Sequence, residues 1–317
     1  MIALDLLQII VFPGVLFLLV LAFFYEWIDR KMHAKVQNRY GPLHTGPAGL
    51  FQPVADFVKL LSKEDIVPSV CDKLIFSAAP IIYLTLPLTA LFLIPIAGNT
   101  ALVAFEGDLL LINFVFALMI ITVFLAGWSS INRFSIIGGV RAILQMMSFE
   151  IPLGLAIIGP AIAAKSLSIS TISQWQSTAT WTVLIQPIGF AVLVICLLAE
   201  LETEPFNIPE AESEIVAGWL TEFSGRKLAM FRLGKNLELI LASSLISVLY
   251  LGGIQQIAFI PAPVIFLIKT IAVVLLISFL RSIFARLRID QSIRGMWKYL
   301  LPLAVLQIVL ILAGIGA

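Results

Sequence analysis

The sequence is poor in the side chains that hold redox cofactors and metals. Its 317 residues include only 2 cysteines and 2 histidines, whereas an iron–sulfur cluster or a structural zinc ion typically takes about four protein ligands. The chain contains no G-x-G-x-x-G, P-loop, C-x-x-C or H-E-x-x-H motif. Charged residues make up only 12% of it and the net charge is +1, so no basic surface for nucleic acid is expected. The sequence predicts no cofactor or metal held by this chain and no nucleic-acid partner.

Apolar residues are abundant instead. They make up 60% of the chain, against about 45–50% in an ordinary soluble domain. A helix needs roughly 20 mostly apolar residues to cross the hydrocarbon core of a bilayer. Eight stretches qualify: Leu4–Tyr25, Leu74–Ala97, Leu109–Trp128, Ala142–Ala164, Trp181–Ala199, Leu237–Ile257, Pro261–Leu280 and Tyr299–Ile315. We predict an all-α, polytopic protein of the cell membrane, with about eight transmembrane helices in a single membrane domain over residues 1–317.

Basic residues fall almost entirely into four of the predicted loops. Residues 26–73, 129–141, 200–236 and 281–298 hold 18 of the 20 lysines and arginines. Because basic loops stay on the cytoplasmic side, these loops are predicted to face the cytoplasm and both termini to face out. The first and third loops are far longer than the roughly 2–8 residues that join bundled helices. They predict a docking platform for cytoplasmic partners.

Both long loops show helical periodicity. In the first, the membrane helix is expected to continue to Val36, and an amphipathic interfacial helix follows, with an apolar face of Leu50, Val54, Phe57, Val58 and Leu61. In the third, Pro209 is expected to begin a helix whose first turn holds Glu210 and Glu212. A solvated face is the ordinary interpretation of so many acidic residues, and proton or cation traffic is the alternative.

Two ionisable residues are predicted to lie inside the bilayer. Glu150 comes about nine residues into its span, roughly 13 Å deep at about 1.5 Å per residue, and Lys269 lies at a similar depth in another span. An unpaired carboxylate there is costly, so such residues pair, protonate or contact water, and they commonly serve transport. Arg141 is too far along the helix to reach Glu150, so Lys269 or a water chain is the expected partner. A structural interhelical pair is the alternative.

Four stretches of the chain carry a family resemblance. They are RYGPLHTGPAGLFQPVADFVKLLSKED, GGVRAILQMMSFEIPLGLA, AELETEPFNIPEAESEIVAGWLTEFSGRKLAMFRL and SFLRSIFARLRIDQSIRGMWKYLLPLAV, in this order. They closely resemble the hallmark stretches of the NADH dehydrogenase subunit 1 family, whose bacterial members are the H-type membrane subunits of complex I. Its relatives include the matching membrane subunits of archaeal membrane-bound hydrogenases and sulfane sulfur reductases. The resemblance covers practically the whole chain.

The resemblance implies a non-redox membrane subunit that docks a peripheral electron-transfer arm and couples its reaction to H⁺ or Na⁺ translocation. Together with the depth argument for Lys269, it implies ion-translocation or coupling roles for Glu150, Glu200, Glu210, Glu212, Glu214, Glu222 and Lys269. It implies contact with a cytoplasmic chamber or a partner for Arg30, Asp56, Lys59, Lys63, Glu64, Arg141, Arg281 and Asp290. We expect the same contact for Arg232 and Lys235, which lie where the chain departs from the family pattern. In complex I members, that chamber is where quinone approaches the terminal iron–sulfur cluster.

One position departs from the family pattern. Quinone-reducing members usually carry a glutamate where Lys235 follows Gly234, and Arg232 adds a second cation. The departure argues against a quinone site and favours the ferredoxin-linked hydrogenase or sulfur-reductase branch, although the first loop keeps the complex I form. The alternative is the quinone-chamber subunit of an NADH or F420H2 dehydrogenase.

The resemblance also implies partners. They are a hydrogenase-large-subunit-like protein and a small subunit with iron–sulfur clusters, nickel–iron in the hydrogenase branch, and antiporter-like membrane subunits. Two other classes of function stay open. An independent secondary transporter usually shows internal repeats, and none is evident here. A purely structural anchor leaves Glu150 and the acidic loop without a role.

Overall fold

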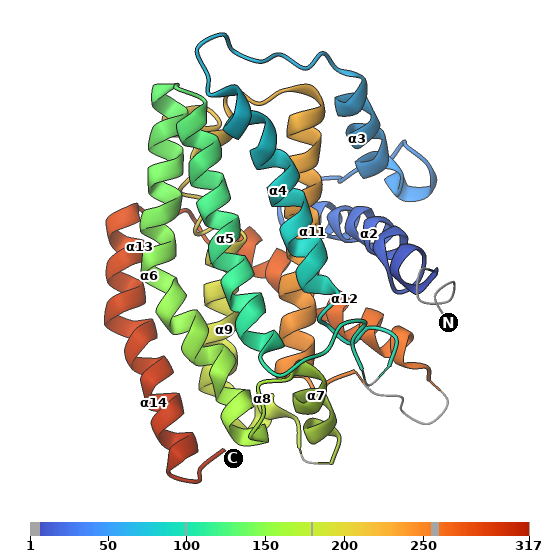
Figure 1. Ribbon diagram of the computed structural model, residues 1–317, viewed down its shortest axis with the longest axis vertical. Coiled ribbons are helices and arrows are strands. Elements are labelled where there is room, and N and C mark those ends of the chain that lie inside the picture. Colours follow the sequence, from blue (N-terminus) through green and yellow to red (C-terminus); the bar gives the residue numbers. More distant parts are fainter. Residues whose placement is uncertain (1–6, 99, 179, 255–259, 317) are drawn as a thin grey trace.

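The computed structural model describes residues 7–98, 100–178, 180–254 and 260–316, and the chain is helical within them (Figure 1). The predicted all-α, polytopic membrane fold is confirmed. The longer helices are α2 (Val15–Val36), α4 (Lys73–Leu91), α5 (Asp108–Ser129), α6 (Arg133–Ala164), α9 (Pro187–Glu200), α11 (Gly225–Leu249), α12 (Ala262–Ile283) and α14 (Leu301–Leu312). The shorter ones are α3 (Gln52–Ser62), α7 (Ile169–Thr178), α8 (Thr182–Ile185), α10 (Glu212–Ile215) and α13 (Ile289–Gly295).

Six segments of the described chain are long and apolar enough to cross a membrane. They are Leu7–Val36, Lys73–Leu91, Asp108–Ser129, Arg133–Ala164, Ala262–Ile283 and Ile289–Leu312. The other two predicted spans fall on α9 and α11. α9 has only 14 residues, with Pro187 at its start, and α11 carries Lys235 and Glu238 among its apolar residues. The count of eight spans therefore stays a prediction.

Three long helices, α4, α5 and α6, run side by side through the molecule (Figure 1). α14 and α9 pack against α6, and α11 packs against α4. α2 is steeply inclined to these helices and packs on α12 and α11. Fully buried aromatic side chains, including Phe76, Phe116, Phe149 and Phe231, fill the spaces between the helices. The arrangement leaves α2, α11 and α12 together at one side of the bundle, where the site described below lies.

Glycines allow α6 to approach its neighbours closely, as small residues do at the interfaces of membrane helices. A Cβ atom on Gly138 would lie 2.5 Å from the backbone nitrogen of Trp219, and one on Gly127 of α5 would lie 2.5 Å from the carbonyl oxygen of Ser135. Both distances are too short for a side chain. Gly138 thereby lets α6 hold the segment 201–224, which carries Trp219, against the bundle.

The two long loops differ in how well the sequence predicted them. The first behaves as expected, because α2 continues to Val36 and α3 follows as an amphipathic helix. The prediction of a helix beginning at Pro209 is wrong. α10 spans only Glu212–Ile215, and Ala211 and Val216 on either side of it have φ values of +27° and +64°. A regular helix cannot continue through such residues, so segment 201–224 is mostly irregular.

Candidate functional site

A cavity of about 1100 Å³ lies where α2, α11 and α12 meet segment 201–224. We call it the polar cavity. Its walls carry charged side chains of both signs: Glu26, Asp29, Arg30, Arg39, Glu202, Glu204, Glu210, Glu212, Arg232, Lys235 and Arg281. Apolar residues such as Leu239 and Ile277 complete its wall. The cavity therefore combines the size of a small-molecule site with an unusual density of charge.

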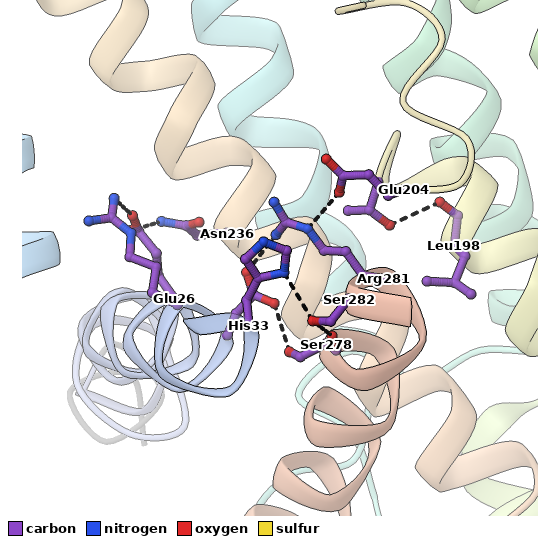
Figure 2. Close-up of polar contacts among 11 residues, drawn as sticks. Glu26, His33, Leu198, Glu204, Asn236, Ser278, Arg281 and Ser282 are labelled. Atoms are coloured by element: carbon purple, nitrogen blue, oxygen red, sulfur yellow. Dashed lines mark hydrogen bonds and ion pairs between the residues drawn. The ribbon is translucent and has the colours of Figure 1, made fainter. Parts of the chain in front are cut away.

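About two turns of α2 supply a polar stripe to this cavity. Glu26, Asp29, Arg30 and His33 recur at intervals of three and four residues, so they share one face of the helix. Glu26 accepts a hydrogen bond from Nδ2 of Asn236 on α11 at 2.5 Å and forms an ion pair with Arg30. Figure 2 shows the Glu26 and Asn236 side chains pointing toward one another across the two helices.

Arg30 also reaches the amphipathic helix α3. Its Nη1 donates to Oδ2 of Asp56 at 2.6 Å, and Nε2 of Gln52 donates to the other oxygen, Oδ1, at 2.8 Å. Burial alone would raise the pKa of the Asp56 carboxyl, but the hydrogen bonds from Arg30 and Gln52 and the charge of Arg30 outweigh it and lower that pKa. These contacts fasten α3 to α2.

Arg281, near the end of α12, joins two other elements. Its Nη1 lies 2.7 Å from Oδ2 of Asp29 and its Nε 2.8 Å from Oε2 of Glu204 (Figure 2). Ser278 donates to Asp29 at 2.7 Å, and Ser282 lies 3.0 Å from Nδ1 of His33. Burial alone would raise the pKa of Glu204, but the charge and hydrogen bond of Arg281 lower it. Arg281 thus links α2, α12 and segment 201–224.

Lys235, the residue that departs from the family pattern, lies among carboxylates of the cavity wall. Its ammonium lies 3.1 Å from Oε2 of Glu202, forms an ion pair with Glu210, and sits 5.4 Å from the centre of the Trp219 ring. Trp219 Nε1 donates to the same Glu202 oxygen at 3.3 Å. Burial and the neighbouring Glu210 raise the pKa of Glu202, although Lys235 opposes this rise. The cation at position 235 is therefore neutralised by two carboxylates of the cavity wall.

A series of carboxylates leads away from the polar cavity: the buried Glu202, Glu238 and Glu200 and the partly buried Glu150. We call this series the carboxylate path. Glu238 of α11 is 3% exposed and accepts a hydrogen bond from the Tyr83 hydroxyl at 2.7 Å. Glu200, at the end of α9, is 1% exposed and interacts electrostatically with the other three carboxylates. Within the described residues, neither of its carboxylate oxygens has a hydrogen-bond partner.

The carboxylate path ends at Glu150, which is residue 18 of the 32 residues of α6. Nδ2 of Asn113 on α5 donates to Oε1 of Glu150 at 3.1 Å. The second oxygen of Glu150 and Oδ1 of Asn113 are buried without a partner in the described part of the chain, as is Oε1 of Gln145. Unsatisfied polar atoms grouped in this way suit ordered water, which needs several polar partners.

The expected pairing of Glu150 with Lys269 is wrong. Nζ of Lys269 donates to the carbonyl oxygens of Leu251 and Gly253 at 2.6 and 2.7 Å and lies 5.0 Å from the centre of the Trp181 ring. Lys269 therefore holds the turn after α11, and its charge is dispersed over carbonyl dipoles and an aromatic ring. Asn113 lies beside Glu150 in place of Lys269, and the other expected partner, a water chain, stays a prediction.

Several other predicted residues lie away from the carboxylate path. Glu214 is exposed and pairs with Arg141 at 2.6 Å and with Arg286. Glu222 accepts a hydrogen bond from Nδ2 of Asn132 at 2.5 Å. Four predicted residues are exposed, do not line the polar cavity and form no ion pair with the described part of the chain: Lys59, Lys63, Glu64 and Asp290. Arg232 and Glu212 are exposed at the wall of the polar cavity.

Sequence reasoning missed four contributors to the site: Glu26, Asp29, Tyr83 and Glu238. Glu238 lies at the start of a predicted span and is buried between α11 and α4. A signal for two of the others was available, because the acidic Glu26 and Asp29 lie at helical spacing from the basic Arg30 and His33. Tyr83 lies in an apolar run with no charged neighbour in the sequence, so only the packing of α4 on α11 reveals it.

Comparisons with known proteins identify the family of this chain. The family model described as NADH dehydrogenase matches residues 7–312. The H subunit of the NADH-quinone oxidoreductase of Dehalococcoides mccartyi strain CBDB1 is 39% identical over 294 residues, which cover 93% of this chain and 82% of that protein. The H subunit of the F(420)H(2) dehydrogenase of Methanosarcina mazei is 38% identical over 299 residues, which cover 89% of this chain and 85% of that protein. The chain belongs to the NADH dehydrogenase subunit 1 family and is the H-type membrane component of a complex I-like enzyme.

Proposed function

We propose that this subunit couples a redox reaction in a peripheral arm to ion translocation across the membrane. The observation that carries the proposal is the carboxylate path, which connects the polar cavity to the middle of α6. Four interacting carboxyl groups titrate as a set, so a change of charge at one alters proton occupancy at the next. A carboxylate deep in a membrane helix is costly unless it is paired, protonated or hydrated, and such residues commonly mark ion or proton pathways.

The polar cavity is the proposed place where redox turnover acts on this chain. A charge that enters or leaves it shifts the balance among Lys235, Glu202 and Glu210. Because Glu202 belongs to both the cavity wall and the carboxylate path, that shift reaches Glu238 and Glu200 electrostatically and then Glu150. Peripheral subunits with iron–sulfur clusters supply the electrons, and antiporter-like membrane subunits carry the ion traffic further.

The test is Glu150→Gln, which keeps the shape of the side chain and removes its titration. In the assembled complex reconstituted into liposomes, we expect normal assembly and peripheral cofactor content but loss of most ion uptake per electron transferred. Glu106→Gln is the matched control, because Glu106 is an exposed acid outside the helices. Ion uptake at the wild-type ratio in Glu150→Gln would show that the carboxylate path is structural.

Two branches of the family remain as candidates for the redox reaction. The cavity volume and the neutralised Lys235 suit a quinone headgroup, as in an NADH or F420H2 dehydrogenase. The exposed cation Arg232, which forms no ion pair within 4.0 Å in the described residues, favours the hydrogenase or sulfur-reductase branch. Purification with native partners separates them. A photoreactive quinone that labels α2 or α11 supports the first, and co-purification of a nickel–iron large subunit with no quinone labelling supports the second.

A further inference from the structure

A second hollow, separate from the carboxylate path, lies between α2 and α12. It has a volume of about 620 Å³, and its lining includes Trp27, Lys31, Lys35, Arg39, Ile271 and Leu275. We call it the basic groove. It adjoins the polar cavity through Arg39 and the residues that follow it. The proposed coupling function does not use this groove.

The chain reversal after α2 builds one wall of the basic groove. Asn38 adopts a left-handed conformation with φ of +55°, and the Arg39 amide donates to the carbonyl oxygen of Ala34 at 2.9 Å. The chain then runs back along α2, so that a Cβ atom on Gly41 would lie 3.3 Å from Cδ of Lys31. The reversal therefore places Arg39 on the same side of the molecule as Lys31 and Lys35.

The charge in the basic groove is of one sign. Its lining includes three cations and no carboxylate. Within the described residues, Lys31 and Lys35 form no ion pair, whereas Arg30, Lys235 and Arg281 of the polar cavity each bind two carboxylates. The groove is thus complementary to an anion in a way that the adjoining cavity is not.

An exposed apolar surface continues from the basic groove along both helices. On α2, Leu16 and Val20 are 56% and 63% exposed and share a helical stripe with Trp27 and Lys31. On α12, Ile268 and Leu275 are 58% and 38% exposed and share a stripe with Ile271. Exposed apolar side chains on membrane-spanning helices face lipid chains or another membrane subunit.

We propose that the basic groove binds an anionic phospholipid. Lys31, Lys35 and Arg39 hold the phosphate of its headgroup, and its acyl chains lie on the apolar stripes of α2 and α12. Basic pockets between membrane helices at the membrane surface bind anionic headgroups. Trp27 and Tyr40, which is 87% exposed, provide the amphipathic aromatic rings that are enriched at the membrane–water interface.

The test uses the assembled complex in phosphatidylcholine nanodiscs with a phosphatidylglycerol that carries a photoreactive group on an acyl chain. We expect cross-links to peptides of α2 and α12, which unlabelled phosphatidylglycerol suppresses and phosphatidylcholine does not. The double variant Lys31→Gln/Lys35→Gln should lower the apparent affinity in this competition about thirtyfold, since each basic residue near an anionic surface contributes about fivefold. Lys59→Gln/Lys63→Gln, at the C-terminal end of α3 and directly after it, removes the same charge at the same spacing and should leave these cross-links unchanged.

Three results would overturn the proposal. A phosphatidylcholine probe that labels the groove equally would remove the role of charge, and so would an unchanged affinity in the double variant. An amine-reactive reagent that joins Lys31 or Lys35 to another subunit would show that protein occupies the groove. If the double variant does not assemble, Lys35→Gln, at an exposed position, should still lower the affinity about fivefold.

Discussion

At the scale of single residues, the ion pair of Glu204 with Arg281 gives a pH-dependent test. The pKa of Glu204 is lowered from its usual value, so the pair stabilises the fold at pH values above the unfolded pKa of about 4.3. That stabilisation is lost as the pH falls through the lower, folded pKa. We expect Glu204→Gln to lower the thermal midpoint of the complex at neutral pH, and its difference from wild type to shrink at about pH 4. Glu106→Gln serves as the control, and a Glu204→Gln deficit independent of pH would contradict the prediction.

The sequence singled out a residue best where an ionisable side chain lies deep inside a predicted membrane span. The charge and depth of Glu150 identify it without a structure, and it does lie in the middle of α6. Its partner could not be predicted, because Asn113 is a neutral residue on another helix and only the packing of α5 on α6 brings the two together. For Lys269, the sequence predicted the wrong kind of partner. A cation at depth suggests an anionic partner, but backbone carbonyls at the end of α11 satisfy it equally well.

At the scale of elements, Gly138→Ala tests whether α6 positions segment 201–224. The new methyl group would lie 2.5 Å from the backbone nitrogen of Trp219, and overpacking of this kind typically costs about 1–3 kcal/mol. We expect a lower thermal midpoint of the complex and weaker attachment of segment 201–224, measured by faster hydrogen exchange there.

Gly154→Ala is the matched control on the same helix. A Cβ atom at Gly154 meets nothing within 4 Å, and alanine in a helix interior is favoured over glycine by roughly 0.5–1 kcal/mol. Its midpoint should be equal to or above that of wild type. Equal behaviour of the two alanine variants would show that the approach of α6 to Trp219 is not a tight contact.

Helices could be predicted from apolar periodicity, whereas irregular segments could not. α3 was predicted closely because its apolar positions repeat every three to four residues. Segment 201–224 has a similar apolar pattern in Ile215, Trp219 and Phe223 but does not form one helix. Its backbone is set by tertiary contacts, namely the ion pairs of Glu202, Glu204 and Glu210 with α11 and α12 and the packing of Trp219 on α6, which no local pattern encodes.

At the scale of the whole molecule, the two ends of the bundle differ in kind. The α3–α4 connection and the α5–α6 turn lie at one end, and α7, α8 and the C-terminal residues lie at the other (Figure 1). The basic residues near the α3–α4 connection and the α5–α6 turn predict that this end of the bundle faces the cytoplasm and that both termini face out. The two native cysteines, Cys71 and Cys196, are buried, so an introduced cysteine can be labelled against a low background.

The prediction is tested with single cysteines at exposed positions. Ala104→Cys and Ser177→Cys should react with a membrane-impermeant maleimide added to intact cells, whereas Lys63→Cys and Ser213→Cys should react only in inverted vesicles stripped of the peripheral arm. Because the polar cavity lies among α2, α11, α12 and segment 201–224, this orientation places it on the side from which soluble electron-transfer subunits approach. Labelling of Lys63→Cys in intact cells would reverse the orientation and leave the polar cavity facing away from those subunits, which is incompatible with the proposed coupling.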